Sequence, residues 1–265
     1  MLVSLLGFEW DASSSYARGA ASGPSMIRAQ LFNEASSAFS LSGVDIRQVL
    51  TVRQFPALAA DAAACREQIS ACVAQELAAG YAPLSLGGDH SITYPILEAI
   101  KARHGPVNVL HIDAHPDMYD EFDGDRYSHA SPFARALEGG CINNLVQVGI
   151  RSSNPQLREF GQRHDVTMLG AEQVGDVPYD RLQGPLYISI DLDGLDPAFA
   201  PGVTHQEPGG LTTREVIAMI ARCPGQVIGA DVVELNTERD INLLTANVAA
   251  RLVKELAAKM AAEPE

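Results

Sequence analysis

Positive charge is scarce in this chain, and the little that is present does not cluster. The 265 residues include 19 Lys and Arg against 33 Asp and Glu, which gives a formal net charge of −14. Binding to nucleic acid or to an anionic membrane needs concentrated positive charge, because Lys and Arg neutralise the phosphates. We therefore predict no nucleic-acid partner and no membrane partner, and we expect a small molecule as the binding partner.

Cysteine and long apolar runs are also scarce. The four cysteines are scattered and form no C-x-x-C pair, which is typical of reduced, mostly buried thiols in a cytoplasmic protein. No stretch approaches the roughly 20 apolar residues of a transmembrane helix. The apolar start, residues 1–8, lacks the basic flank of a signal peptide and runs directly into Glu9 and Asp11. These absences predict a cytoplasmic location.

Apolar residues are plentiful, at 46% of the chain, and they fall into short runs that alternate with segments of helical spacing. The predicted strands are 2–7, 83–86, 107–113, 144–149, 166–169, 186–191 and 227–233, and the predicted helices are 26–33, 59–80, 94–104, 132–137, 157–164, 213–222 and 245–260. Thr212 is the expected N-cap of the helix 213–222. Residues 44–52 give a mixed signal. The alternation predicts βαβ units and a mainly parallel sheet covered on both faces, and no linker divides the chain, so we expect one domain, 1–265.

Carboxylate and imidazole side chains come at or directly after the ends of three predicted strands. The candidate metal ligands are His90, Asp113, His115, Asp117, Asp191 and Asp193. Side chains two apart in an extended backbone point the same way, and in parallel sheets ligands bind beyond the carboxyl ends of the strands. The six groups are therefore expected to converge on one site.

Four carboxylates and two imidazoles are too many for a single ion, and the negative charges would repel one another unless divalent cations offset them. Two ions about 3.5–4 Å apart are the natural solution, and such a pair activates water at neutral pH. A donor set rich in carboxylate, with some imidazole and no thiolate, favours Mn²⁺, with Fe²⁺ and Co²⁺ as alternatives. We expect two Mn²⁺ per subunit.

Three motifs resemble the signatures of the ureohydrolase family, which contains the arginases, the agmatinases and related guanidino-acid hydrolases. They are Gly87-Gly88-Asp89-His90-Ser91, Asp113-Ala114-His115-Pro116-Asp117 and Ser189-Ile190-Asp191-Leu192-Asp193-Gly194-Leu195-Asp196-Pro197. The likeness covers nearly the whole chain, and the run Tyr127-Ser128-His129-Ala130-Ser131 is most similar to the plant arginases. It implies a three-layer α/β/α sandwich with a central, mainly parallel sheet of about eight strands, assembled as a homotrimer or homohexamer.

The resemblance also implies roles for individual residues. His90, Asp113, Asp117 and Asp191 match the ligands of one manganese, and Asp113, His115, Asp191 and Asp193 match those of the other. His129 matches the proton-shuttling histidine, and Glu234 matches the carboxylate that pairs with the substrate guanidinium. A histidine is suited to give a proton to the departing amine, and the products are urea and an amine.

The choice of guanidino substrate depends on the far end of the pocket, which the loop 120–128 is expected to face. Asp125 stands where plant-type arginases carry asparagine, and an acidic residue repels a carboxylate but attracts the free amine of agmatine. Arg126 in the same loop could instead bind a carboxylate, and His205 is a candidate for the pocket rim. Agmatine is therefore slightly favoured over L-arginine. A guanidino acid of the guanidinobutyrate type and a formimino compound are the further alternatives.

Overall fold

The protein contains an eight-stranded sheet, which the computed structural model describes together with the rest of residues 2–262. The strands are β1 Leu2–Phe8, β2 Leu50–Val52, β3 Tyr81–Gly87, β4 Val107–Ile112, β5 Ile142–Val148, β6 Thr167–Leu169, β7 Leu186–Asp191 and β8 Val227–Val233. Their order is β2-β1-β3-β8-β7-β4-β5-β6, and every pair of neighbours is parallel. The predicted parallel sheet of about eight strands is thus confirmed.

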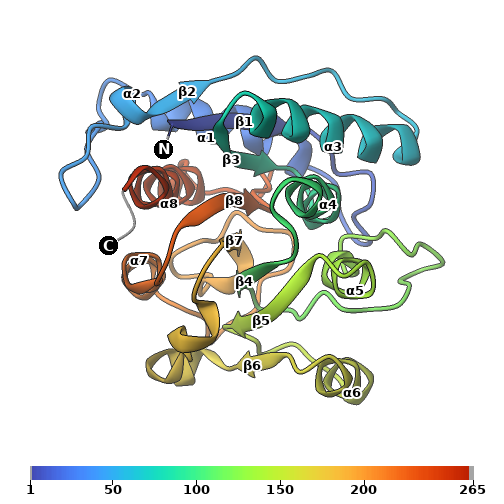
Figure 1. Cartoon of the computed structure of the whole chain (residues 1–265). Coiled ribbons are helices and arrows are strands. Elements are labelled where there is room, and N and C mark those ends of the chain that lie inside the picture. The colour runs from blue at the N-terminus through green and yellow to red at the C-terminus, as the bar shows by residue number, and fades with distance from the viewer. Residues whose placement is uncertain (1, 263–265) are drawn as a thin grey trace.

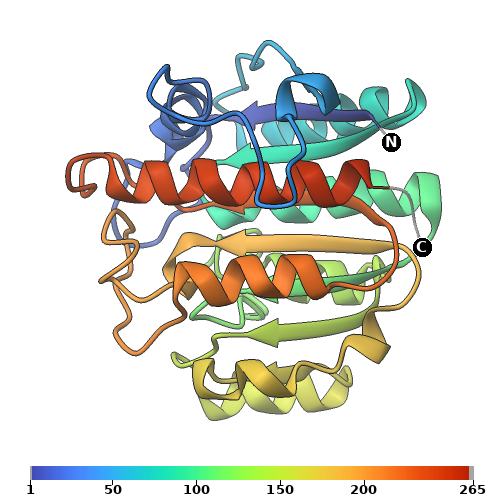
Figure 2. The same cartoon turned by 90° about the vertical axis from the view of Figure 1, so that its left-hand side faces the viewer.

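Helices cover both faces of this sheet (Figures 1 and 2). They are α1 Gly23–Leu31, α2 Ile46–Val49, α3 Ala62–Ala78, α4 Thr93–His104, α5 Pro132–Glu138, α6 Pro155–Arg163, α7 Thr213–Arg222 and α8 Leu244–Ala261. One layer is formed around α8, which packs against α1, α2 and α7; the other contains α3, α4, α5 and α6. The result is the expected three-layer α/β/α sandwich.

The core follows the alternation of the strands. In β4, Leu110 and Ile112 pack into the apolar cluster that includes α8, whereas Val107 and Val109 pack into the cluster that includes α4. Every residue of β4, β7 and β8 is buried. Strands buried on both faces form continuous apolar runs, which is why these segments could be recognised in the sequence.

Several element boundaries differ from the prediction for local reasons. Helix α1 begins at Gly23, three residues before the predicted start, because Pro24 occupies its first turn, where no backbone N–H has to be paired. The undetermined stretch 44–52 contains α2 and the edge strand β2. Two short 3₁₀ helices, Ala171–Asp176 and Tyr179–Leu182, were not predicted. Thr212 does cap α7, as expected.

Two further expectations concern the cysteines and the absence of membrane-spanning helices. Three of the four cysteines are buried and all four are free. None of the helices within residues 2–262 is long and apolar enough to cross a membrane.

Candidate functional site

The site lies at the carboxyl ends of four adjacent strands, β3, β8, β7 and β4. His90 follows β3, Asp113 follows β4, Asp191 is the last residue of β7, and Glu234 comes directly after β8. Because parallel neighbours end at the same edge, residues distant in sequence meet here. The turn after β3 needs Gly88, where a Cβ atom would collide with the backbone oxygen of Trp10.

One group of possible metal ligands surrounds His90. Its Nδ1 lies 3.2 Å from Asp113 Oδ2, 3.1 Å from Asp117 Oδ2 and 3.1 Å from Asp191 Oδ2. This nitrogen is buried and makes no hydrogen bond. A buried ring nitrogen facing three carboxylate oxygens without a hydrogen bond is suited to share a cation with them.

A second group lies beside the first and shares Asp113 with it. It consists of Asp113, His115 and Asp193, with His115 Nδ1 3.1 Å from Asp193 Oδ2 and 3.4 Å from Asp113 Oδ1. The resemblance implied that Asp191 also belongs here. In the structure Asp191 belongs to the group around His90, whose ring its Oδ2 faces, and its Oδ1 accepts a hydrogen bond of 2.8 Å from the backbone of Asp193. Its place among the ligands of a second ion stays a prediction.

Negative charge makes this cluster costly without cations. Burial and the neighbouring carboxylates of Asp193 and Asp113 raise the pKa of Asp191 well above its ordinary value, and burial and Asp113 raise that of Asp193 to about 7. Divalent cations remove this repulsion and hold the carboxylates ionised. The residues present, all oxygen and nitrogen donors, therefore fit a pair of divalent ions with Asp113 between them.

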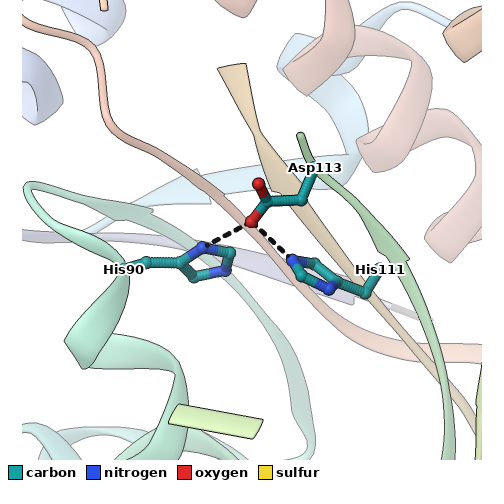
Figure 3. A group of neighbouring side chains, drawn as sticks. All are labelled: His90, His111 and Asp113. Carbon is teal, nitrogen blue, oxygen red and sulfur yellow. Dashed lines mark hydrogen bonds and ion pairs between the residues drawn. The ribbon is translucent and has the colours of Figure 1, made fainter. Parts of the chain in front are cut away.

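A third histidine, His111, supports the shared carboxylate; it is fully buried and is not among the residues that line the cavity described below. His111, in β4, approaches Asp113 Oδ2 with its Nε2 at 2.8 Å, from the side opposite His90 (Figure 3). The Gln147 amide directs its two N–H groups to His111 Nδ1 at 3.0 Å and to the backbone oxygen of Pro116 at 2.7 Å. Since Nδ1 accepts from this amide, the proton of the neutral ring is on Nε2 and points at Asp113.

The other nitrogen of His90 is held in a similar way from β7 and β8. Its Nε2 lies 2.9 Å from Ser189 Oγ, and the Ser189 hydroxyl donates to Asp231 at 2.6 Å. Thr93 and Tyr187 also donate to Asp231, at 2.7 and 2.6 Å. Because an oriented partner on the far nitrogen fixes the ring and its tautomer, this network keeps Nδ1 of His90 directed into the site.

His129 and Glu234 form the pair beside the metal ligands. His129 Nδ1 is 3.0 Å from Glu234 Oε1, which also accepts from the backbone N–H of His90 at 3.0 Å. Burial lowers the pKa of His129, but the Glu234 carboxylate more than reverses this and the pKa is about 9. His129 in turn lowers the pKa of Glu234, although burial opposes the shift. The carboxylate therefore stays ionised, and the histidine can hold a proton.

A cavity of about 250 Å³ opens over both the metal ligands and this pair. Its walls include Ser15, His115, Asp117, Tyr119, Phe122, His129, Ser152, Asp191, Asp193, His205, Glu207 and Glu234. His205 lies on the wall, with its ring centroid 5.6 Å from that of His129 and 5.8 Å from that of His115.

Asp125 and Arg126 are not among the residues that line this cavity, so the structure does not bring them together with the other candidates, and a contact with the substrate stays a prediction. Asp125 is exposed and uses its carboxylate to accept a hydrogen bond from the backbone of Tyr127. Arg126 is exposed and pairs with Asp120 and Glu138. The loop 120–128 does contribute Phe122 to the cavity wall, and beyond it a tight turn, closed by the backbone bonds between Phe122 and Asp125, leads outward to the exposed Asp125 and Arg126.

The sequence reasoning missed Glu207 and left the role of Ser15 open. Glu207 lies two residues after His205, so the pattern of alternate side chains could have placed both on one wall. Ser15 belongs to the run Ser13–Ser15 in the N-terminal loop, and the family resemblance implies only that this loop lies near the substrate entrance. Its contact with His129 spans 114 positions along the chain, and no local pattern encodes it.

Comparison with known proteins is consistent with this geometry. The sequence model described as "Arginase family" matches residues 2–258. Arginase 1, mitochondrial, from Arabidopsis thaliana is 43% identical over 97% of this chain and 81% of its own, and the mitochondrial agmatinase of Gallus gallus is 35% identical over 96% and 79%. The solved arginase of Medicago truncatula superimposes with a TM-score of 0.92 at 38% identity, over 98% of this chain and 87% of that one.

Proposed function

The chain belongs to the arginase family of ureohydrolases, and from that premise we propose that it hydrolyses a small cationic guanidino compound, agmatine first, with two Mn²⁺ ions. The products are urea and an amine. The observation that carries this proposal is the placement of Glu234 and His129 on the wall of a cavity whose floor is two adjoining groups of metal ligands.

The metal ligands and the pair Glu234 and His129 have separate roles in the proposed reaction. The two ligand groups that share Asp113 would hold a pair of divalent ions, which when bound would supply a water-derived nucleophile at neutral pH. Glu234 is buried and ionised, so its carboxylate can accept two N–H bonds from a guanidinium and present the guanidino carbon. His129 then delivers a proton to the nitrogen that departs as the amine.

The charge of the cavity wall favours a substrate with a second positive group. Among the described residues, the wall has several carboxylates but no Lys or Arg. The nearby Arg151 is unavailable, because its guanidinium donates to the backbone oxygens of Asp193 and Glu207, at 2.6 Å in both cases. Glu207 is partly exposed on the wall, with its carboxylate 3.6 Å from His115. A free amine meets an opposite charge here, whereas a free carboxylate meets none except histidine.

L-Arginine is the second candidate, and neutral hydroxyl groups on the wall favour it. Tyr119 accepts a hydrogen bond from Asn154 at 2.8 Å, so its own O–H proton is free to be donated to a carboxylate, and Ser152 lies on the same wall. The 43% identity to a protein named arginase supports the same choice.

The deciding experiment measures urea release by Mn²⁺-loaded protein from agmatine, L-arginine, 4-guanidinobutyrate and 3-guanidinopropionate at equal concentration, with a formimino compound assayed for ammonia or formamide. Agmatine should react fastest. Preference for arginine would indicate that the hydroxyl groups of Tyr119 and Ser152 bind the carboxylate of the substrate. No reaction with any guanidine, together with release from the formimino compound, would reject the guanidino proposal.

The variant Glu207→Gln tests the proposed contact with the amine. It should raise KM for agmatine about tenfold, because a charge-assisted hydrogen bond of roughly 1.5 kcal/mol or more is lost, and it should leave KM for arginine unchanged or lower. Glu159→Gln, which makes the same charge change on the exposed face of α6, is the control. An equal rise in KM for both substrates would contradict a role in selecting the amine.

We also propose a cytoplasmic location and a homotrimeric or homohexameric assembly. The scattered free cysteines favour the cytoplasmic location. The Arabidopsis thaliana and Gallus gallus relatives, in contrast, are named as mitochondrial proteins. Cell fractionation tests the location, and light scattering of the purified protein tests the assembly.

A further inference from the structure

The segment 10–19, here called the N-terminal strap, is held over the site at both of its ends. Near its start, the backbone N–H of Ser13 donates to Asp89 Oδ2 at 2.9 Å. The backbone oxygen of Ser13 accepts from the backbone N–H of His129 at 3.2 Å. At its far end, the backbone oxygen of Arg18 accepts from the side-chain amide of Asn236 at 3.1 Å. These contacts fix the backbone between them and bring Ser15 onto the cavity wall.

His129 has only one nitrogen that can exchange a proton with the cavity. Its Nδ1 lies 3.0 Å from Glu234 Oε1, and an ionised carboxylate only accepts hydrogen bonds. Nδ1 therefore carries a proton in both the neutral and the charged ring. Any proton that His129 gives up to a substrate must leave from Nε2.

Ser15 occupies the space directly in front of that nitrogen. The Ser15 hydroxyl oxygen lies 2.9 Å from His129 Nε2, and the Ser15 backbone N–H donates to the same nitrogen at 3.2 Å. The N–H stabilises the neutral ring, in which Nε2 is an acceptor. The hydroxyl serves both forms, since it can donate to the neutral ring and accept from the charged one.

We propose that the Ser15 hydroxyl carries the proton from His129 to the departing nitrogen of the substrate. His129 Nε2 gives its proton to Ser15 Oγ as Ser15 gives its own hydroxyl proton to the substrate nitrogen, while the bond from the guanidino carbon to that nitrogen breaks. His129 ends neutral, Ser15 is unchanged, and the amine leaves as neutral R–NH₂, which keeps the electron pair of the broken bond and the transferred proton; the positive charge passes to the urea fragment, which loses a proton to become neutral urea. This inference rests on the proposed function, because it assigns a further catalytic residue to that reaction.

Two geometric features favour this route over direct transfer from His129. Ser15 Oγ is within hydrogen-bond distance of Nε2 and lies on the cavity wall, so it can touch both the histidine and the substrate. The strap backbone is held on either side of Ser15, at Ser13 by Asp89 and at Arg18 by Asn236, so the hydroxyl is positioned before substrate binds.

The test compares Ser15→Ala, Ser15→Thr and Ser14→Ala in the metal-loaded protein. Ser14 is the matched control, since it is the neighbouring hydroxyl of the strap and faces Asp89 at 3.5 Å. Loss of a proton-transfer group costs about a hundredfold in rate. Ser15→Ala should therefore lose about tenfold to a hundredfold in kcat with KM and metal content nearly unchanged, Ser15→Thr should recover most of the rate, and Ser14→Ala should behave as wild type.

The basicity of the leaving nitrogen separates proton transfer from a structural role. With an alkoxyguanidine, whose departing nitrogen is much less basic than an alkylamine and depends less on protonation, the loss caused by Ser15→Ala should shrink. An equal loss with both substrates, or wild-type kcat in Ser15→Ala, would overturn the proposal.

Failure of the proposed function would be recognised separately, because wild-type protein would then release no urea from any guanidine. In that case the ¹⁵N chemical shifts of the His129 ring test the contact itself. A protonated Nδ1 together with an Nε2 signal that moves in Ser15→Ala but not in Ser14→Ala would support the Ser15 contact, and an unmoved Nε2 signal would contradict it.

Discussion

Glu234 acts on two partners, since the carboxylate that is placed to hold a guanidinium also bonds to the ring of His129. Burial lowers the pKa of that ring, and Glu234 raises it; Asp117 and Asp89 add smaller effects in the same direction, and the result is about 9. His129 is therefore charged at neutral pH in the metal-free protein, and it loses its proton as the pH rises through about 9.

Replacing Glu234 with Gln should lower the pKa of His129 from about 9 towards or below its ordinary value of 6.5. The sign follows from the charge, because removing a neighbouring anion destabilises the imidazolium and lets the proton leave at lower pH. NMR titration of the His129 ring in metal-free protein measures the change. Glu238→Gln, an exposed residue four positions on, is the control. A pKa that stays near 9 in Glu234→Gln would show that another group holds the proton.

His111 illustrates how far a residue can matter without touching the substrate. The sequence favours a core position or support of a ligand for it, and the structure gives it one hydrogen bond to Asp113 and one from Gln147. Oriented partners of metal ligands typically contribute tenfold to a hundredfold in metal affinity. The Gln147 amide and the His111 ring should therefore act together to orient the Asp113 carboxylate.

His111→Phe should lower the affinity for Mn²⁺ by about tenfold to a hundredfold, because Asp113 loses the N–H that orients it. Calorimetric titration of metal into the metal-free variant measures the change. Phe133→Leu disturbs the packing on the same ring, 4.0 Å away, but leaves the bond to Asp113. If both variants bind Mn²⁺ as tightly as wild type, His111 does not position the shared ligand.

At the scale of single elements, helix α7 owes its sharp start to a reciprocal cap. The Thr212 hydroxyl oxygen accepts from the backbone N–H of Glu215 at 3.2 Å, and the Glu215 carboxylate accepts from the backbone of Thr212 at 2.8 Å. This is the capping box, and it pairs two N–H groups that the first turn would otherwise leave unsatisfied.

Thr212→Ala should therefore lower the free energy of unfolding by about 1 kcal/mol and leave kcat unchanged, because Thr212 is not among the residues that line the cavity. Urea denaturation measures the difference. Thr213→Ala removes the same groups one residue later, inside the helix, where the side chain makes no cap. A similar loss in both variants would attribute the effect to packing and not to the cap.

Elements that are fixed by contacts within a few residues were predicted from the sequence, and elements that are fixed by distant contacts were not. Strand β8 and helix α7 match their predicted bounds, because buried strands and caps are encoded within a few residues. The two short 3₁₀ helices between β6 and β7 were missed, since they are fixed by packing on the sheet and carry no apolar period. The outward turn of the loop 120–128 depends on backbone pairing that its composition does not reveal.

For the whole molecule, the sequence predicts the ligands better than the walls of the cavity. His90, Asp113 and Asp191 stand next to strand ends, so a parallel sheet alone brings them together. Ser15 and Glu207 reach the cavity from loops whose folding depends on contacts across the chain, such as the bond from Arg151 to the Glu207 backbone. We propose that these wall residues decide the choice of substrate, and this is why the motifs alone leave it open.

The buried carboxylates at the centre of the sheet link metal binding to the stability of the whole fold. Four carboxylates, those of Asp113, Asp117, Asp191 and Asp193, are almost entirely buried together with His90, and without cations the carboxylates repel one another. An ion that binds only the folded chain stabilises it by about 2.7 kcal/mol when its free concentration is a hundred times its Kd.

Adding Mn²⁺ to metal-free protein should therefore raise Tm, and two ions should be bound per subunit when the sites are saturated. In Asp193→Asn the second ligand group loses a carboxylate, so the variant should bind one ion tightly and show a smaller rise. Asp180→Asn, an exposed residue of a 3₁₀ helix, should respond as wild type. Calorimetric scans with metal analysis of the same samples measure both quantities. Two tightly bound ions in Asp193→Asn would remove this residue from the ligand set, and no rise in wild-type Tm would contradict a metal centre built into the folded core.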